Sequence, residues 1–192
     1  MTKFNLESFP SLKKYLNESY LIEGSARKRD LYKICNELDI TIFATKFNDD
    51  SLSGLIRKQE SRWEIYVSDT DSPRRKSFTI AHELGHYFSY VDQQLSFSTL
   101  NDEGILEDKA IFNRDTTNGK RHGSDSISKM EAEANFIASN LLMPENLVKA
   151  AFLENKNIDE MADEFGVSGS AMGFRLVNLD LLPIESIGAY GG

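Results

Sequence analysis

Two histidines and a glutamate lie close enough in the sequence to build a metal centre. His82, Glu83 and His86 have the order H-E-x-x-H and include two of the chain's three histidines. On a helix, positions i and i+4 share one face about one turn apart, so both imidazoles can bind one zinc ion. Glu83 lies beside the first histidine and can act as general base toward a metal-bound water. The spacing therefore predicts a hydrolytic zinc site.

A catalytic zinc site needs a third protein ligand. No further histidine follows at the metzincin spacing, so this ligand must be His122 or a carboxylate of the helix expected over residues 129–143. Glu131 and Glu133 lie about 200° apart around that helix, so only one of them can face the metal. We favour Glu131 because its neighbours on the helix are apolar. Asn135 shares its face and can hydrogen-bond to a ligand histidine.

A second electrophile commonly stabilises the oxyanion that develops during attack on a carbonyl. Four side chains are candidates, and the sequence does not choose among them: His122, Arg121, Tyr87 and Arg175. We include His122 in the catalytic set because it lies in the long segment between the two expected metal-binding helices.

Composition restricts what kind of protein can carry this site. The chain has 192 residues and a formal net charge of -8, from 22 basic and 30 acidic residues. That length favours one domain, and the acidic balance argues against nucleic-acid binding. A single cysteine, Cys35, excludes an intrachain disulfide and has the spacing of a helix core residue. No apolar stretch approaches the ~20 residues that span a bilayer, and the N-terminus lacks a secretory signal, so we expect a cytoplasmic protein.

Periodicity predicts the elements that must position the site. A helix, three strands and then mainly helices follow one another, which is typical of an α+β fold. Residues 91–127 have no clear pattern. Within the strands, Trp63, Ile65 and Val67 alternate with polar residues, as in a half-buried strand. The expected helices are 28–39, 74–90, 129–143, 144–153, 158–165 and 168–178, and the expected strands are 40–47, 51–59 and 63–69.

Two blocks of sequence resemble the ImmA/IrrE family of zinc metallopeptidases. They are FTIAHELGHYF, at residues 78–88, and EAEANFIASNLLMP, at residues 131–144. The second departs from the family pattern in that its phenylalanine comes one place early. The segment 158–182 resembles the short helical segment that often follows, whereas 91–127 matches nothing in the family. The resemblance extends over residues 28–182, and Glu131 falls at the position of the family's third zinc ligand.

This resemblance implies a small zincin-like domain, mostly helical, with a short sheet of three or more strands beside the two metal-binding helices. We expect an N-terminal extension (1–27), the metallopeptidase domain (28–153), a C-terminal helical segment packed on it (154–182) and a tail (183–192). Family members cut helix-turn-helix repressors, often encoded beside them on mobile elements. The resemblance thus implies a protein substrate and Zn²⁺ as cofactor. Manganese would be tolerated by the same ligands.

We expect one of the strands 51–59 and 63–69 to pair with an extended substrate segment.

Two other functions stay open. Residues 158–177 have the pattern of a helix-turn-helix, but residues 153–182 carry six acidic and two basic residues, and this local charge of -4 would repel phosphates. Alternatively, the chain is a latent zinc-binding regulatory protein. An intact H-E-x-x-H with its general base favours the peptidase.

Overall fold

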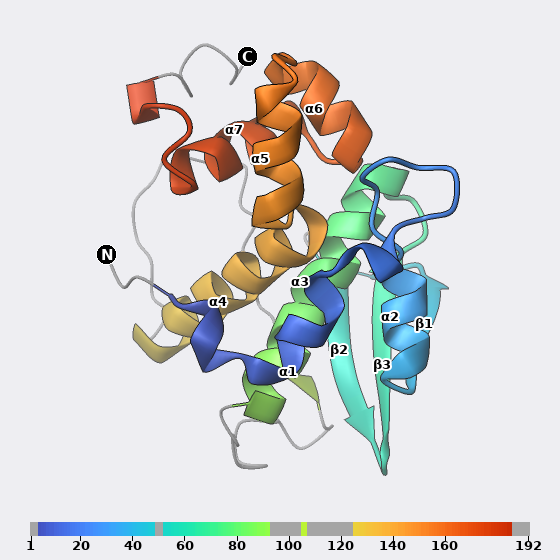
Figure 1. Cartoon of the computed structure of the whole chain (residues 1–192). Helices are drawn as coiled ribbons and strands as arrows, with labels where there is room; N and C mark the ends of the chain where they lie inside the picture. The colour runs from blue at the N-terminus through green and yellow to red at the C-terminus, as the bar shows by residue number, and fades with distance from the viewer. Residues whose placement is uncertain (1–3, 49–51, 93–104, 107–124, 186–192) are drawn as a thin grey trace.

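The fold was analysed on a computed structural model, which describes residues 4–48, 52–92, 105–106 and 125–185. Helix α3 (Pro73–Asp92) runs through the middle of the molecule, with α4 (Asp125–Leu142) on one side and the β-sheet on the other (Figure 1). The helices α5 (Glu145–Leu153), α6 (Ile158–Phe165) and α7 (Gly169–Asn178) gather at one end. This arrangement confirms the predicted α+β fold.

The sheet has the strand order β1-β3-β2-β4 and combines parallel with antiparallel pairs. β1 (Ile40–Thr45) runs parallel to β3 (Arg62–Ser68), and β2 (Gly54–Gln59) is antiparallel to β3. Trp63, Ile65 and Val67 are buried, as their alternation predicts, and the Trp63 ring packs edge-on against Tyr87 and Tyr90 of α3. One face of the sheet therefore supports α3.

Several element bounds differ from the sequence-based expectations, among them the start of α4 at Asp125 inside the segment expected to be irregular. A two-residue strand, β4 (Ile105–Leu106), pairs with β2 inside the segment that we expected to be irregular. The helix α2 (Leu31–Glu37) begins three residues later than predicted because the Asp30 carboxylate caps it, accepting from the Lys33 amide at 2.9 Å. Pro144 is the cap residue of α5 rather than its first helical residue. The Asp30 cap therefore decides where α2 begins.

The N-terminal residues contribute to the same core as the rest of the chain. Short helical turns run over Leu6–Ser8, Pro10–Lys13 (α1), Lys14–Leu16 and Glu18–Tyr20. Leu12 and Tyr15 are buried, and the Tyr15 ring packs on Phe88 of α3 at 5.6 Å. Arg29, also buried, donates to the carbonyl of Asn17 at 2.7 Å and to that of Tyr15. The division of the chain near residues 27 and 153 stays a prediction.

Cys35 lies on the buried face of α2 with a side chain that is 1% exposed. Burial raises the pKa of its thiol to about 12, so the sulfur stays protonated at neutral pH. This is the core role that its spacing predicts. No helix in the described part of the chain is long and apolar enough to cross a membrane.

Candidate metal centre

Helix α3 presents the H-E-x-x-H residues from a buried part of the molecule. His82, Glu83 and His86 are 3%, 1% and 3% exposed. The helix begins at Pro73, and the preceding Ser72 hydroxyl accepts from the Arg75 amide at 3.3 Å. A buried imidazole needs polar partners, so a site of this kind must supply them within the protein or through a bound ion.

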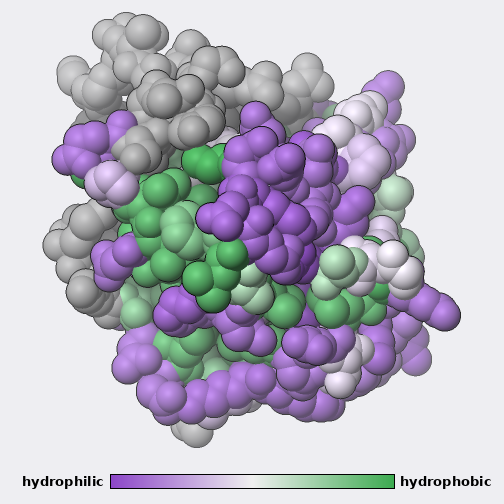
Figure 2. Space-filling view, turned by 45° about the horizontal axis from the view of Figure 1, so that its top comes forward, coloured by the Kyte–Doolittle hydropathy of each residue, from purple (hydrophilic) through white to green (hydrophobic). Residues whose placement is uncertain are grey.

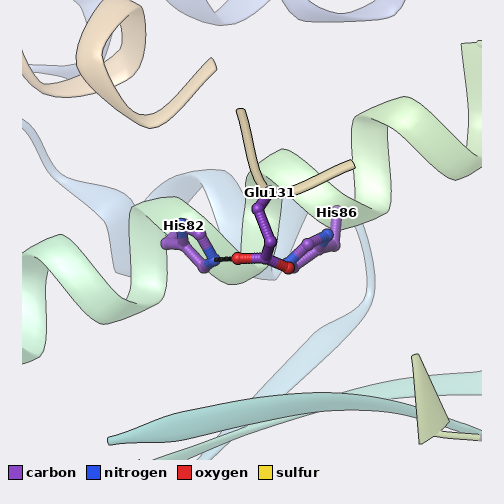
Figure 3. A group of neighbouring side chains, drawn as sticks. All are labelled: His82, His86 and Glu131. Atoms are coloured by element: carbon purple, nitrogen blue, oxygen red, sulfur yellow. Dashed lines mark ion pairs between the residues drawn. The ribbon is translucent and has the colours of Figure 1, made fainter. Parts of the chain in front are cut away.

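Glu131 of α4 points between the two imidazoles (Figure 3). His82 Nε2 lies 3.4 Å from Glu131 Oε2, and His86 Nε2 lies 3.4 Å from Glu131 Oε1. Ligand atoms of all three residues lie within 4.8 Å of one another. Two ligands at ~2.0–2.1 Å from a tetrahedral zinc ion would be about 3.4 Å apart, which is the separation of both His–Glu pairs. The cluster is therefore compatible with a metal site.

Asn135, one turn along α4 from Glu131, fixes the orientation of one imidazole. Its side-chain oxygen lies 3.1 Å from His82 Nδ1. When Nδ1 carries the proton and donates to this oxygen, Nε2 presents its lone pair toward Glu131, which is the tautomer that a metal ligand requires. The Phe78 ring stacks on the other side at 6.1 Å from the His82 ring. His82 is thus held between α4 and the preceding turn of its own helix.

Glu133, the other carboxylate considered as a ligand, lies outside the cluster. Glu133 has its Oε1 3.6 Å from the ammonium of Lys129, and its side chain is 6% exposed. The group of residues able to hold an ion, within the described ranges, consists of His82, His86 and Glu131. The structure places Glu131 in the cluster and Glu133 away from it, as their angular separation on the helix requires.

Two glycines let the elements around the centre approach closely, and the sequence reasoning assigned neither of them this role. A Cβ atom on Gly85 would lie 2.6 Å from the carbonyl oxygen of Ala134, so α3 and α4 touch backbone to backbone beside the cluster of His82, His86 and Glu131. A Cβ atom on Gly54 would lie 3.3 Å from Glu83 Oε1 and 2.2 Å from the Thr79 methyl group. In the sequence, an isolated glycine within an expected strand is the feature that could have predicted the close approach at Gly54.

Within the described residues, none of the four candidates for oxyanion stabilisation belongs to the cluster of His82, His86 and Glu131. His122 and Arg121 lie outside the described ranges. The Tyr87 ring packs against Trp63 at 5.5 Å, and burial raises the pKa of its phenol. Arg175 is buried in α7 and donates to the carbonyl of Met143 at 2.9 Å and to Asn140 Oδ1 at 2.8 Å. The structure therefore gives Tyr87 and Arg175 packing and anchoring roles.

The sheet topology corrects one expectation about substrate pairing. β3 is hydrogen-bonded on both sides, to β1 and to β2, so residues 63–69 have no edge to offer a peptide. β2 pairs with β4 on its outer side at Ile56 and Arg57. Within the described ranges this pairing covers Ile56 and Arg57, and an added Cβ atom on Gly54, the first residue of β2, would lie 3.3 Å from Glu83 Oε1. Of the two strands expected to bind substrate, β2 is therefore the one that stays a candidate.

The helix-turn-helix-like segment forms α6 and α7, two packed helices at the end of the molecule. Arg175 is the only basic residue of α7, and it is 5% exposed. Burial lowers the pKa of its guanidinium to about 10, which leaves it charged at neutral pH. The Arg175 guanidinium donates to Asn140 of α4 and to Met143. Helix α7 therefore presents no basic side chain to a phosphate backbone.

Comparison with known proteins agrees with this geometry. Residues 35–177 match the peptidase family described as the IrrE N-terminal-like domain. The Metallopeptidase ImmA of Bacillus subtilis (strain 168) is 22% identical over 149 residues, which cover 77% of this chain and 75% of that protein. Protein TIC 214 of Helianthus annuus is 29% identical over 120 residues, 59% of this chain but only 7% of that protein.

A solved structure supports the fold independently. A Mycobacterium tuberculosis transcriptional regulator superposes with a TM-score of 0.54 at 17% identity, over 90% of this chain and 47% of that one. At this identity the likeness concerns the fold alone. The chain spans about half of that regulator, whose remaining part has no counterpart in this alignment.

Proposed function

Since the chain belongs to the IrrE N-terminal-like domain family of metallopeptidases, we propose that it is a zinc-dependent endopeptidase. We further propose that it cuts a helix-turn-helix repressor or an antitoxin-like partner at a specific site. The observation that carries the proposal is the convergence of His82, His86 and Glu131 from two buried helices. A structural ion would not need a buried carboxylic acid beside its first ligand, and Glu83 is such a residue.

His82, His86 and Glu131 would hold the zinc ion, with Asn135 fixing the His82 tautomer. Zinc bound there would act as a Lewis acid toward the scissile carbonyl and would lower the pKa of a water molecule at the site to ~7. Glu83 accepts a proton as the water attacks and returns it to the leaving amine. His82, Glu83 and His86 are buried, which keeps bulk water from competing for the hydrogen bonds that their side chains make.

The substrate class is supported by two considerations. Among the described residues, Gly54 and Leu55 of β2 have no strand partner on the outer side of the sheet, and Gly54 lies beside Glu83, which suits an extended polypeptide. The relatives add a regulatory context: one is a metallopeptidase, and the solved structure with the same fold is a transcriptional regulator. We therefore place the repressor among possible protein substrates as the first to test.

The test is co-expression with the helix-turn-helix protein encoded nearest to this chain, in zinc-supplemented cells, with fragments measured by intact mass. Wild type and Glu83→Gln are compared, because the variant keeps the metal ligands but removes the base. One cut by wild type that is absent in the variant is the expected result. Cutting by the variant at the wild-type rate would refute the role of Glu83. An intact partner in both cases, with zinc bound, would favour the latent regulatory function.

A further inference from the structure

A large cavity opens beside the candidate metal centre, between the start of α3, the middle of α4 and α7. Its volume is about 1040 Å³. That exceeds the ~300–1,000 Å³ of typical small-molecule pockets. Asn135 and Phe78, two of the residues that contact His82, both line it. The cavity therefore reaches two side chains that flank His82, although His82, Glu83, His86 and Glu131 do not themselves line it.

The lining combines apolar surface with an excess of positive charge. Its apolar members include Phe78, Met143 and Phe174, and Phe174 is 56% exposed although it is a large aromatic residue. Three arginines line it against one carboxylate, and the residues are Arg74, Arg75, Arg175 and Asp71. Arg74 and Arg75 have acidic partners, Asp163 and, at 3.9 Å, Asp71, but the lining is still more basic than the whole chain, which carries a net charge of -8. Such a local excess of basic residues favours an acidic ligand that also has apolar side chains.

The arginines differ in how they can meet a ligand. Arg175 is anchored to α4 and provides fixed positive charge in the wall. Arg75 donates to Ser53 Oγ at 2.8 Å, which places its guanidinium next to the residue before Gly54. Arg74 pairs with Asp163 of α6, where both side chains are more than half exposed. An exposed pair of this kind contributes little, so an incoming carboxylate can exchange with Asp163 at low cost.

Figure 2 shows hydrophobic residues gathered beside a strongly hydrophilic area on the side from which the C-terminal helices come forward. Exposed apolar side chains of this part of the chain are Leu153, Phe174 and Ile184. Of these three, only Phe174 lines the cavity. Ser170, one turn earlier on α7, lines it as well and is small, so the helix leaves space in front of the Phe174 ring. We expect this ring to be the apolar contact of the cavity with its ligand.

We propose that this cavity binds the substrate segment on one side of the scissile bond and selects acidic residues interspersed with apolar ones. The inference rests on the proposed peptidase function and specifies its substrate. It assigns Phe174 and Arg74 as specificity-determining residues, and it gives α7 a role as a wall of the peptide site. A single-stranded nucleic acid is the other anionic polymer that the cavity could admit. The net negative charge of the chain and the buried Arg175 disfavour it.

The test measures binding separately from cleavage. Two fluorescein-labelled peptides of twelve residues share the same leucines and phenylalanine and differ in carrying four glutamates or four lysines. Fluorescence anisotropy is recorded with the zinc-loaded full chain carrying Glu83→Gln, so the probe is not consumed. We expect the glutamate peptide to bind at least about tenfold more tightly, with an affinity that falls as salt rises. A single-stranded DNA of twelve nucleotides serves as competitor.

Matched variants locate the binding. In the same background, Phe174→Ala should weaken binding of the glutamate peptide about fivefold or more. Leu153→Ala removes a more exposed apolar residue outside the cavity and should have no effect. Arg74→Gln should weaken the glutamate peptide and reduce its salt dependence, whereas Lys149→Gln, which also breaks an exposed pair, should not.

Equal binding of the two peptides, or equal effects of variants and controls, would overturn the proposal. So would displacement of the peptide by the DNA at lower concentration than by unlabelled peptide. Mass spectrometry of the same glutamate peptide after incubation with wild type tests the peptidase function independently. Selective binding without cleavage would retain the cavity assignment and contradict the peptidase, and cleavage without selectivity would do the opposite.

Discussion

Replacing Gly85 with alanine should separate the two helices that carry the metal cluster. An added Cβ atom would lie 2.6 Å from the Ala134 carbonyl oxygen and 2.7 Å from the Ala134 Cα. Both atoms belong to backbone, so no side chain can rotate away. Ordinary contact begins at 3.4 Å, so α4 would have to retreat by about 0.8 Å, the difference between this and the shorter distance.

That displacement is large on the scale of metal coordination. Ligand distances in a functional site are held to ~0.2 Å, and Glu131 lies one turn before the contact on the same helix. We expect zinc affinity to fall by at least roughly tenfold. Overpacking costs about 1–3 kcal/mol, and the greater helix propensity of alanine offsets about 1 kcal/mol of this cost. The free energy of unfolding should therefore fall by up to about 2 kcal/mol.

Zinc affinity is measured by competition with a chromophoric chelator, and stability by urea unfolding of the metal-free chain. Gly173→Ala is the matched control, because a Cβ atom there meets nothing within 4 Å. We expect it to leave zinc affinity unchanged and to raise stability by up to about 1 kcal/mol. If Gly85→Ala bound zinc as tightly as wild type, the close helix contact would not set the ligand geometry and the reasoning would be refuted.

Two other substitutions probe the surroundings of the site, and the remaining predictions concern Cys35 in the core. Asn135→Ala should lower zinc affinity about 10–100-fold by releasing the His82 ring, and unchanged affinity in the chelator assay would remove the role of the amide. Gly54→Ala should destabilise the fold by about 1–3 kcal/mol because its Cβ would lie 2.9 Å from the Tyr66 carbonyl oxygen; urea unfolding at the wild-type midpoint would contradict this. With a pKa of about 12, Cys35 should not react with a thiol reagent at pH 8 until urea unfolds the chain, and rapid labelling of the folded protein would show that it is accessible. Above pH 9 its thiol ionises only in the unfolded chain, so the stability of the fold should decrease there.

Local sequence patterns predict much of the site because the pairing of its residues follows helix geometry. The i, i+4 spacing brings His82 and His86 to one face, and the same spacing in α4 aligns Glu131 with Asn135. Alternation in β3 predicts which residues are buried. These features depend on the period of one element, which a sequence shows directly.

Features that depend on contacts between distant elements could not be predicted in this way. The strand order places β3 in the centre of the sheet, so of the two strands expected to pair with substrate the alternative 63–69 is excluded, and 51–59 stays a prediction. The approach of Gly54 to Glu83 joins a strand to a helix, and the backbone contact at Gly85 joins two helices. The cavity needs three elements that are far apart in the sequence. No periodicity reports such contacts, although an isolated glycine marks where one can occur.

The zinc content of the purified chain and of one ligand variant tests the account most directly. Wild type, Glu83→Gln and Glu131→Ala are loaded with zinc, desalted and measured by native mass spectrometry. We expect one zinc ion per chain in wild type and Glu83→Gln, and loss of most of the metal in Glu131→Ala, since the latter removes one of three ligands. Full zinc occupancy in Glu131→Ala, or none in wild type, would contradict the proposed metal centre.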